Sequence, residues 1–459
     1  MERLNIEIPE GAAAILHRLT LAGYEAYIVG GCVRDCLLGR DPKDWDITTS
    51  ARPYEVKSLF DRTIDTGIAH GTVTVMIGRE GYEVTTYRID GEYEDCRHPK
   101  EVQFTNQLIE DLKRRDFTIN AMAYNPETGV VDEFDGIGDL ERRIIRCVGE
   151  PAERFDEDAL RILRAVRFSA QLGFEIDEAT CRAIRDKAMQ LTLISAERIQ
   201  MELVKILTSS HPAHMKLACD LGITAVILPE YDRIRGVSQK TPNHIYDVEV
   251  HTLKAMENIE PDTVLRLTML MHDFGKPDVK RVLDNGREIF YRHPEISAAC
   301  AERILRRLKF DNDTRTRVVR LVKWHGLKYD ASEKSVRRAL NRVGEDIFND
   351  FIKVQRADIQ AKNPAVIPDK LTLLREKEQT YHRIIEEGQC FTVRQLAVGG
   401  RDLIKAGIQP GPLLGAVLDK LTEAVIDDQS LNEKEKLLAL AMELKDDPDV
   451  FRPKEEFFM

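Results

Sequence analysis

The chain has 459 residues, of which 43% are hydrophobic, and a formal net charge of -11. This length suffices for about two to four packed domains, and the acidic balance argues against a protein coated in nucleic acid, although local basic runs can bind a polyanion. No apolar run approaches the roughly 20 residues of a membrane-spanning helix, and the 8 cysteines include no CxxC pair. The sequence therefore predicts a soluble, cytoplasmic protein with no membrane partner.

The N-terminal third has the pattern of a mixed α/β domain. Residues 9–22 have helical periodicity, and short β-branched or aromatic runs follow at 24–29, 45–49, 72–77 and 82–89. From Pro151 onward the strand signals fade and apolar residues fall at helical spacing. The predicted fold class is therefore α+β, with a head at 1–148 followed by a helical neck, a body segment, a further domain and a tail at 149–210, 211–242, 243–365 and 366–459.

The stretch "VGGCVRDCLLGR" places two glycines directly after an apolar, strand-like run. Because they lack side chains, Gly30 and Gly31 allow the backbone to approach a ligand closely, and the first amides of a following helix favour an anion. Phosphate is the expected anion. The stretch matches neither the GxGxxG pattern nor the P-loop pattern, since no GK[ST] follows.

Two carboxylates follow in "DWDITT". The alternation of a strand places Asp44 and Asp46 on one face, where they repel each other and are best accommodated by sharing divalent cations. Glu83 in "YEVTTYR" is a candidate third ligand on a neighbouring strand. Taken alone, the two aspartates are also typical of a solvated turn.

Four motifs in one order resemble those of the class II tRNA nucleotidyltransferases, the CCA-adding enzymes and their poly(A) polymerase relatives. They are "VGGCVRDCLLGR…DWDITT", "RRDFTINAMAY" at 114–124, "EDALRILRAVRF" at 157–168 and "SAERIQMELVKIL" at 195–207. The resemblance implies a DNA polymerase beta-like head, tRNA, CTP and ATP as partners, and no DNA. It further implies template-independent addition of CCA to the 3′ end of tRNA, with release of pyrophosphate.

The resemblance also implies roles for individual residues of the head. Asp44 and Asp46 would bind the catalytic Mg²⁺ ions, in a two-metal transfer of the nucleotidyl group. Gly31 and Arg34 would hold the triphosphate, and Arg115 with Asn120 would meet the nucleotide near its sugar and phosphates.

The third motif suggests how a base is selected. On one helix, Asp158, Arg161, Arg164 and Arg167 would share a face at intervals of three. A carboxylate accepts hydrogen bonds and a guanidinium donates them, which matches the amino group and ring nitrogen of cytosine or adenine and mismatches uracil and guanine. A surface salt bridge between Asp158 and Arg161, worth about 0.3 kcal/mol, is the alternative.

Two further segments bear on the predicted activity. The polar stretch between Arg88 and Arg114 has the pattern of a mobile loop. In the resembling family a loop here is implied in the switch from C to A addition, and enzymes that add only CC lack it. Its presence therefore favours full CCA synthesis over CC-only addition. The alternative is that it is a surface loop with no role in the reaction. In "SAERIQMELVKIL" we expect a structural helix with an Arg198–Glu202 pair.

Basic residues gather in two runs of this acidic chain. Seven arginines lie between Arg142 and Arg167, and 13 Lys or Arg residues face four acids between Arg303 and Arg342. Such runs are either polyanion-binding strips or solvated helix faces.

The C-terminal half contains a second group of candidate ligands. His251, His272 and Asp273 are followed by Asp358, with His293 and His325 between them. Histidines and carboxylates from separate helices suit one or two divalent transition metal ions that activate water. The order resembles the metal-binding set of the HD phosphohydrolases, which makes 243–365 a candidate HD domain; singly, each histidine could equally be structural.

Several activities remain open at this point. CC-only addition, A-only addition and poly(A) addition are neighbouring alternatives to CCA addition. A different class would be an HD phosphohydrolase or RNA-binding module whose head is a vestige, with the second basic run as part of a helical clamp for tRNA.

Overall fold

The computed structural model describes residues 6–91 and 102–451. The chain divides into two compact units, one formed by residues 1–233 and 307–310 and the other by residues 234–306 and 311–459. Within the described ranges, no helix combines the length and the apolar character that crossing a bilayer requires. The candidate nucleotide site belongs to the first unit and the histidine cluster to the second.

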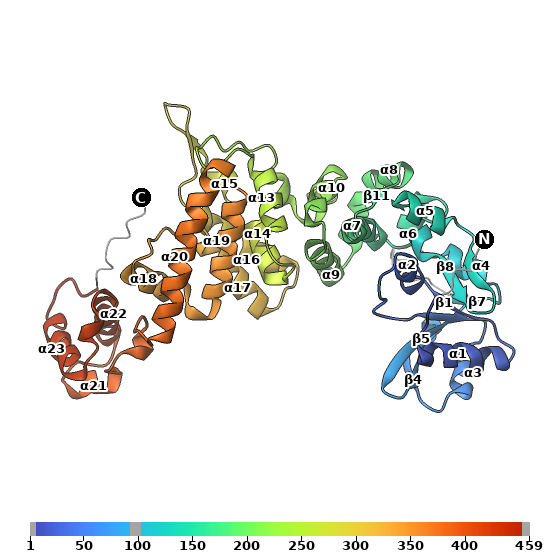
Figure 1. Cartoon of the computed structure of the whole chain (residues 1–459), viewed down its shortest axis with the longest axis horizontal. Helices are drawn as coiled ribbons and strands as arrows, with labels where there is room; N and C mark the ends of the chain where they lie inside the picture. The colour runs from blue at the N-terminus through green and yellow to red at the C-terminus, as the bar shows by residue number, and fades with distance from the viewer. Residues whose placement is uncertain (1–5, 92–101, 452–459) are drawn as a thin grey trace. The chain divides into compact units, whose positions relative to one another are not determined.

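A seven-stranded sheet in the order β3-β4-β5-β2-β1-β8-β9 forms the head (Figure 1). Its strands are β1 (Ala26–Val29), β2 (Ile47–Thr49), β3 (Thr63–Gly67), β4 (Thr72–Ile77), β5 (Glu80–Thr86), β8 (Met122–Asn125) and β9 (Gly129–Asp132). Helices α1 (Glu10–Leu21) and α3 (Pro53–Leu59) pack against strands of this sheet, and α2 (Gly31–Leu37) follows β1 directly. The α+β prediction for the head is confirmed.

The register of the sheet explains the placement of the acidic residues. Strand β2 begins at Ile47, so Asp46 precedes the strand that was predicted to start at residue 45. Asp46 is nevertheless fixed by its backbone, because its carbonyl accepts a hydrogen bond from the Val29 amide at 3.0 Å. Since Ile47 pairs in parallel with Val84, the preceding residues Asp46 and Glu83 lie on the same side of the two neighbouring strands.

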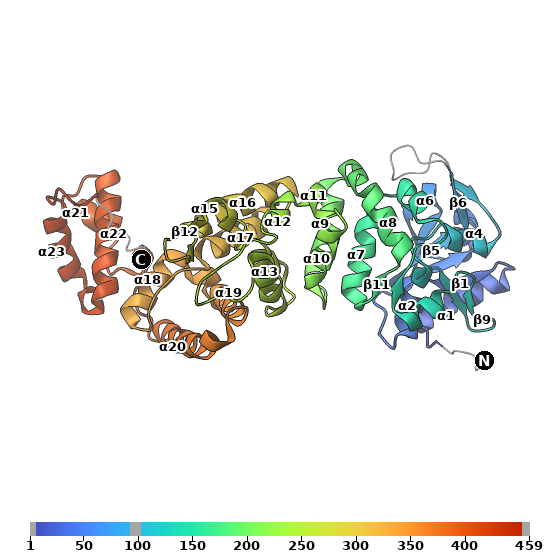
Figure 2. The same ribbon diagram turned by 90° about the horizontal axis from the view of Figure 1, so that it is seen from above.

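The neck continues the first unit as helices. They are α6 (Pro151–Glu157), α7 (Leu160–Leu172), α8 (Glu178–Lys187) and α9 (Ala196–Leu207). The body segment adds α10 (Met215–Asp220), α11 (Thr224–Ile227) and α12 (Pro229–Asp232), and the head itself contains α4 (Leu108–Lys113) and α5 (Gly136–Arg142). Helices α7 and α9 pack closely, as Figure 2 shows. A short parallel pair, β10 (Ile144–Ile145) and β11 (Glu175–Ile176), interrupts the helical pattern.

One helix expected in the neck is in fact two. Helix α6 ends at Glu157 and α7 begins at Leu160, with Asp158 between them in an extended conformation. The Asp158 carboxylate accepts a hydrogen bond from the Leu160 amide at 3.0 Å, which satisfies one of the free amides at the start of α7. The prediction that Asp158 and the three arginines share one helix is therefore wrong.

The described ends of the segment between Arg88 and Arg114 form regular elements. It contains β6 (Arg88–Asp90), which pairs with β7 (Val102–Phe104), and helix α4. The middle of the predicted loop, residues 92–101, lies outside the described residues.

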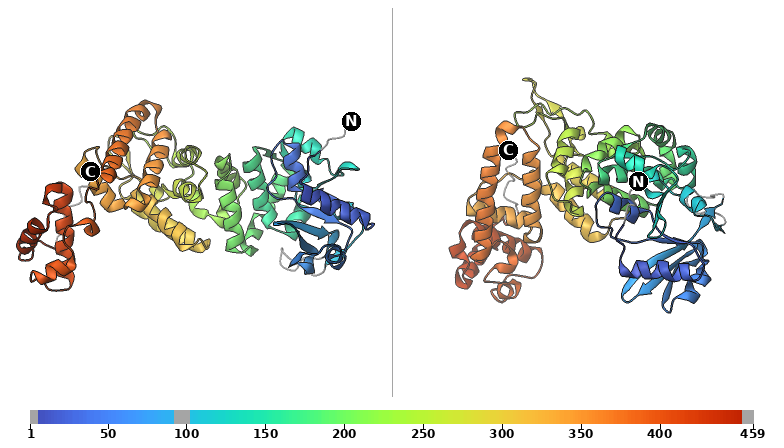
Figure 3. Two further views of the ribbon diagram at one scale, coloured as in Figure 1. Left: turned by 60° about the horizontal axis from the view of Figure 1, so that its bottom comes forward. Right: turned by 45° about the vertical axis from the view of Figure 1, so that its right-hand side comes forward.

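The second unit is helical apart from the hairpin β12 (Arg281–Val282) and β13 (Glu288–Ile289). Its helices are α13 (Val248–Glu257), α14 (Thr263–Met271), α15 (Lys276–Val279), α16 (His293–Arg307), α17 (Asn312–Trp324), α18 (Glu333–Val343), α19 (Phe348–Gln360), α20 (Ile367–Glu386), α21 (Gly400–Lys405), α22 (Pro412–Asp427) and α23 (Lys434–Leu444). The last three pack around a small apolar core (Figure 3). The finer domain division remains a prediction.

Phe117 joins the head to the neck. Its side chain is fully buried, its backbone bridges to Cys147, and its ring meets the Phe168 ring edge-on with centroids 5.7 Å apart. Phe168 in turn supports the guanidinium groups of Arg34 and Arg167, at 5.1 and 4.2 Å from the ring centroid.

We predict that Phe117→Ala lowers the free energy of unfolding of the first unit by about 3–5 kcal/mol, because it leaves a cavity in a packed core. Urea denaturation of the full chain, followed by circular dichroism, measures this. The control is Ile109→Ala, which truncates a side chain that is 42% exposed. Equal denaturation midpoints for the two variants would contradict the role given to Phe117.

Candidate functional site

Three carboxylates line one side of the head. Asp44, Asp46 and Glu83 border a common cavity of about 800 Å³. Burial raises the pKa of Asp46, Glu83 and Asp44 raise it further, and Arg115 opposes them. Carboxylate oxygens suit hard divalent cations, so Asp44, Asp46 and Glu83 are the residues of the head that could hold a divalent metal ion.

A second cavity, of about 650 Å³, adjoins the two aspartates. Its lining includes every residue that the sequence predicted for nucleotide binding: Gly31, Arg34, Arg115, Asn120, Asp158, Arg161, Arg164 and Arg167. Asp44 and Asp46 line the same cavity. Residues up to 136 positions apart, from Gly31 to Arg167, are therefore brought together between head and neck.

The turn after β1 forms one wall of this cavity. Gly30 has φ 83°, and a Cβ there would lie 3.0 Å from the Arg115 guanidinium, so both conformation and space favour glycine. Arg34 donates a hydrogen bond to the Asn120 side-chain oxygen at 2.6 Å. Cys32 is buried beneath the turn, where burial raises its thiol pKa to about 11, and its role is packing.

Two arginines of α7 are oriented by buried acids. Arg164 donates through Nε to Asp116 at 2.7 Å, and although burial opposes it, Arg164 and Asn120 lower the pKa of Asp116. Arg167 pairs with Glu202 of α9 at 3.0 Å. Burial lowers the pKa of Arg167 to about 10, which still leaves it positively charged at neutral pH.

Asp158 and Arg161 are held by different partners. Asp158 pairs with Arg198 at 2.9 Å. Arg161 donates to the Glu157 carboxylate and to the Arg114 carbonyl, the latter at 2.8 Å. Both side chains nevertheless line the same cavity, so the acceptor and donor predicted to select the base face one space, and the alternative interpretation, a salt bridge between them, is wrong.

Sequence reasoning missed the residues that orient this site. From the sequence, no role or only a local one was assigned to four of them: Asp116, Glu157, Arg198 and Glu202. The predicted Arg198–Glu202 pair is wrong, because Arg198 pairs with Asp158 and Glu202 pairs with Arg167 of α7. The one available signal was that all four residues lie inside the recognised motifs.

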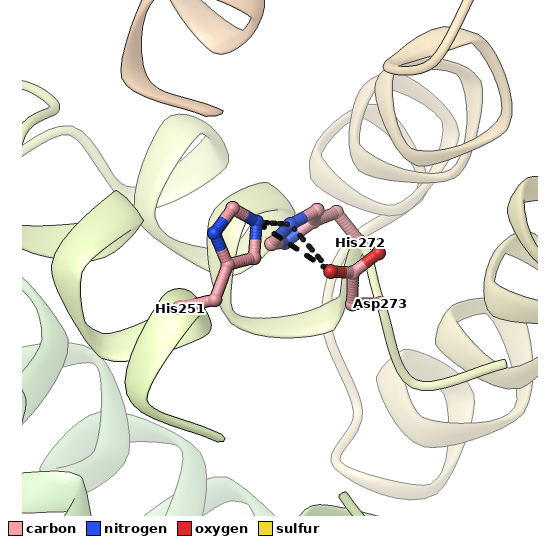
Figure 4. A group of neighbouring side chains, drawn as sticks. All are labelled: His251, His272 and Asp273. Atoms are coloured by element: carbon pink, nitrogen blue, oxygen red, sulfur yellow. Dashed lines mark hydrogen bonds and ion pairs between the residues drawn. The ribbon is translucent and has the colours of Figure 1, made fainter. Parts of the chain in front are cut away.

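The second unit brings its candidate ligands together in a buried cluster (Figure 4). His251 of α13 and His272, which follows α14, face each other with Nε2 atoms 3.2 Å apart. The Asp273 carboxylate lies 3.2 Å from His272 Nε2, and Asp358 of α19 lies 3.1 Å from His251 Nε2. His251, His272 and Asp273 satisfy the spacing of a metal-binding group.

Asp273 also belongs to a second group of ligands. His293 at the start of α16 and His325 after α17 have Nε2 atoms 3.3 Å apart, and the other Asp273 oxygen lies 3.4 Å from His293. One carboxylate is thus shared by two histidine pairs. These residues would suit one or two divalent metal ions, to which Asp273 could contribute from either oxygen.

The protonation of these histidines is set by the backbone. The Nδ1 atoms of His251, His272, His293 and His325 each lie 2.7–3.1 Å from a backbone carbonyl. A carbonyl only accepts hydrogen bonds, so each Nδ1 carries the proton and each Nε2 presents a lone pair to the cluster. Two facing lone pairs cannot bond each other, but both can bind a cation.

The charges around Asp273 agree with this assignment. Burial opposes ionisation, yet the charged groups beside it lower the pKa of Asp273 well below its usual value, and the Lys276 ammonium lies 2.6 Å from it. Burial and the neighbouring histidines lower the pKa of His325 to about 3, which keeps that imidazole neutral. A neutral imidazole and an ionised carboxylate are the forms that ligate metal.

The second basic run is partly neutralised. Arg317 pairs with Asp350 at 2.8 Å, Arg320 with Asp346 at 2.6 Å, and Arg338 with Asp427 at 2.6 Å. These pairs favour the interpretation of a solvated, salt-bridged surface for that part of the run.

Three family models match the chain. The model described as "Poly A polymerase head domain" matches residues 26–146, and the one described as "Probable RNA and SrmB- binding site of polymerase A" matches residues 173–234. A model for tRNA nucleotidyltransferase domain 2 matches residues 289–441. This last model does not name an HD domain, so the HD assignment rests on the side-chain cluster.

Similar proteins cover nearly the whole chain. The CCA-adding enzyme of Levilactobacillus brevis is 38% identical over 94% of this chain and 96% of the relative, and that of Lacticaseibacillus paracasei is 36% identical over 97% and 99%. The crystal structure of the Bacillus stearothermophilus CCA-adding enzyme in complex with CTP superposes with a TM-score of 0.71 at 31% identity, over 95% of this chain and 98% of that one.

A more distant structure, the Thermotoga maritima CCA-adding enzyme complexed with tRNA, shares the fold at 20% identity, with a TM-score of 0.57 over 96% of this chain and 97% of that one. Identity of 36–38% to curated relatives over at least 94% of the chain, together with the order of the matched family models, establishes family membership. The chain belongs to the class II CCA-adding enzyme and poly(A) polymerase family of nucleotidyltransferases.

Proposed function

We propose that this protein adds C, C and A to the 3′ end of tRNA from CTP and ATP without a nucleic-acid template. One observation carries the assignment: a single cavity joins Asp44 and Asp46 to all eight residues expected to bind the nucleotide. The related enzymes named for CCA addition, including one solved with CTP, support this choice among nucleotidyl transfers.

The basic and acidic side chains of the cavity have different proposed roles. Arg34 and Arg115, beside the turn at Gly30, suit the triphosphate, since guanidinium groups bind phosphate oxygens in a planar, paired geometry. Asp44, Asp46 and Glu83 would hold Mg²⁺, which supplies positive charge to the reacting phosphates when bound. The 3′ oxygen of tRNA attacks the α-phosphorus, the bond to pyrophosphate breaks, and the hydroxyl proton is released.

Base selection would come from Asp158 and Arg161. Asp158 retains acceptor capacity beyond its contacts with Leu160 and Arg198, and Arg161 retains donor capacity beyond its contacts with Glu157 and the backbone. Cytosine and adenine each offer an amino donor beside a ring acceptor. Uracil and guanine would leave these polar groups unpaired, which costs about 1–3 kcal/mol for each buried group.

Removing a metal-binding carboxylate tests the catalytic assignment. We expect Asp44→Ala to lower nucleotide addition by about a thousandfold or more, because several kcal/mol of charge stabilisation are lost, while tRNA binding changes little. Addition is read as extended tRNA on a gel and binding by filter retention. The matched control, Asp61→Ala, alters an exposed acid of the same head. Turnover retained in Asp44→Ala would refute the metal assignment.

Base choice is tested at the neck. In Asp158→Ala or Arg161→Ala, we expect UTP and GTP to compete about 10- to 100-fold better against CTP and ATP. Competition assays on tRNA ending before CCA measure this. Asp156→Ala is the control, because Asp156 is an exposed acid of α6, just before the break at Asp158, and pairs with Lys187 at 2.8 Å. Unchanged selectivity for C and A would remove Asp158 and Arg161 from base reading.

The extent of addition separates the neighbouring activities. Transcripts ending before CCA, after C and after CC, each given single nucleotides, should accept C, C and A in turn and then stop. Addition of C alone, of A alone, or of an A tract would instead identify a CC-adding enzyme, an A-adding enzyme or a poly(A) polymerase.

We also propose that the second unit is an HD-type metallophosphohydrolase. Four lone pairs and two carboxylates converge in a buried cluster, and histidine with carboxylate suits a divalent transition metal. When bound, such a metal supplies a Lewis acid that activates water for attack on phosphorus. The chain's own part is to hold each imidazole in the required tautomer through a backbone carbonyl.

Metal analysis tests this second site. The double substitution His272→Ala and Asp273→Ala should abolish bound transition metal and the hydrolysis of bis(p-nitrophenyl) phosphate, while CCA addition persists. Elemental analysis of the purified protein provides the first readout. His382→Ala, which changes an exposed histidine of the same unit, is the control. A parent protein that binds no transition metal would exclude the hydrolytic role.

A further inference from the structure

Two adjoining cavities open onto the histidine cluster. One has a volume of about 410 Å³ and the other about 290 Å³, and both are lined by His325, Asp358 and Lys362. The larger one extends from the cluster to helix α20, and its far wall carries Lys370 and Lys377. The ligand space is therefore longer than the metal-binding cluster alone requires.

The far end of this space is strongly basic. Lys370 and Lys377 lie seven residues apart on α20, which places them on one helix face, and Lys328 lines the same cavity. Lys377 is only 9% exposed and sits over the Tyr329 ring at 4.1 Å. Among the residues that the structure describes, neither Lys370 nor Lys377 has a carboxylate within ion-pair distance, whereas Lys362 is paired with Asp358.

Unpaired ammonium groups of this kind are costly. Burial lowers the pKa of both Lys370 and Lys377, and repulsion between neighbouring lysines adds to it. Asp358 and Asp330 oppose this shift in Lys370 and Lys377 respectively, but neither lies within ion-pair distance, so within the described residues these two lysines have no carboxylate partner of the kind that Glu202 and Asp116 provide for the arginines of the neck. An anionic ligand would supply the missing negative charge.

We propose that Lys328, Lys370 and Lys377 form a phosphate subsite, so that the second unit hydrolyses nucleotide-sized ligands that carry two separate phosphates. This proposal rests on the phosphohydrolase function proposed above. One phosphate binds at the histidine cluster and the other at the lysines. Water adds to the phosphorus at the cluster, the P–O bond to the ribose oxygen breaks, and that oxygen takes the proton from water, so no oxidant or other co-reactant is needed.

Two sources share this chemistry, a free nucleoside bisphosphate and the phosphorylated end of an RNA strand. Uridine 3′,5′-bisphosphate represents the first and a uridine dinucleotide with a 3′-terminal phosphate represents the second. Uridine is chosen because the nucleotidyl-transfer cavity is expected to reject it. Uridine 3′- and 5′-monophosphate, which lack the second phosphate, are the reference substrates.

The test compares phosphate release by the full-length, metal-loaded protein. We expect kcat/KM to be about tenfold higher for a two-phosphate substrate than for the better monophosphate, since one charge-assisted contact is worth about that factor. Lys370→Gln should reduce this preference to about twofold, mainly through KM, and Lys370→Arg should restore it. Arg375→Gln, an exposed cation on the same helix that does not line the cavity, should leave the preference unchanged.

Two controls keep the outcomes distinct. Bound metal and the thermal unfolding midpoint of Lys370→Gln show that the cluster and the fold are intact. If no phosphoester is hydrolysed, calorimetric binding of uridine 3′,5′-bisphosphate still tests the subsite. An affinity that falls about tenfold in Lys370→Gln would support the subsite, although the proposed hydrolytic function would then be wrong. Equal use or binding of one- and two-phosphate ligands by the parent, or an unchanged preference in Lys370→Gln, would overturn the subsite.

Discussion

The nucleotide site depends on one buried carboxylate, that of Asp116. It accepts hydrogen bonds from the Asn120 amide at 3.0 Å, from the Phe117 backbone at 2.8 Å, and from Arg164 of the neck at 2.7 Å. Asn120 in turn accepts from Arg34 of the head at 2.6 Å. Arg34 and Arg164, two of the arginines that line the cavity, are thereby tied into one network across the head and neck, and a buried network of this kind is stable only when every member is satisfied.

Pairing with acids explains why several arginine side chains can lie close together around the cavity. Arg34, Arg161, Arg164 and Arg167 would repel one another if they were merely close, but Asp35, Glu157, Asp116 and Glu202 each offset one of them. Each pairing also fixes the plane of a guanidinium, which a lysine could not offer. The acids therefore prepare the cavity for an anion in the absence of any ligand, and the cost of ordering the arginines is met during folding.

Much of this architecture could be predicted from local pattern. The alternating residues around Ile28 and Val84 indicated the strands, and the motif order indicated a nucleotidyltransferase head. Histidines spaced over α13 to α19 could be grouped because the recognised order of ligands placed them in one cluster, and the structure brings them together. The helix break at Asp158 could not be predicted, because a side chain that caps a helix start and one that extends a helix face have the same spacing. Partners such as Arg198 for Asp158 depend on the packing of α7 against α9, which no i,i+4 rule describes.

The two sites differ in their ligand chemistry, and the difference has a consequence for how they can operate in one chain. The head offers oxygen ligands from Asp44, Asp46 and Glu83, which suit a hard cation such as Mg²⁺, whereas the second unit offers four imidazole nitrogens around Asp273, which bind transition metals far more strongly. The same distinction extends to the groups that meet the ligand: planar arginines surround the nucleotide cavity, and flexible lysines, which act as point charges, surround the other. Arginine side chains, with several donors in one plane, can select a triphosphate and a base edge by their geometry. Lysine side chains attract a phosphate by charge and place little constraint on the part of the ligand that joins two phosphates. Under the proposals made above, the head would choose among nucleotides, whereas the second unit would require charge at two places and tolerate variation between them.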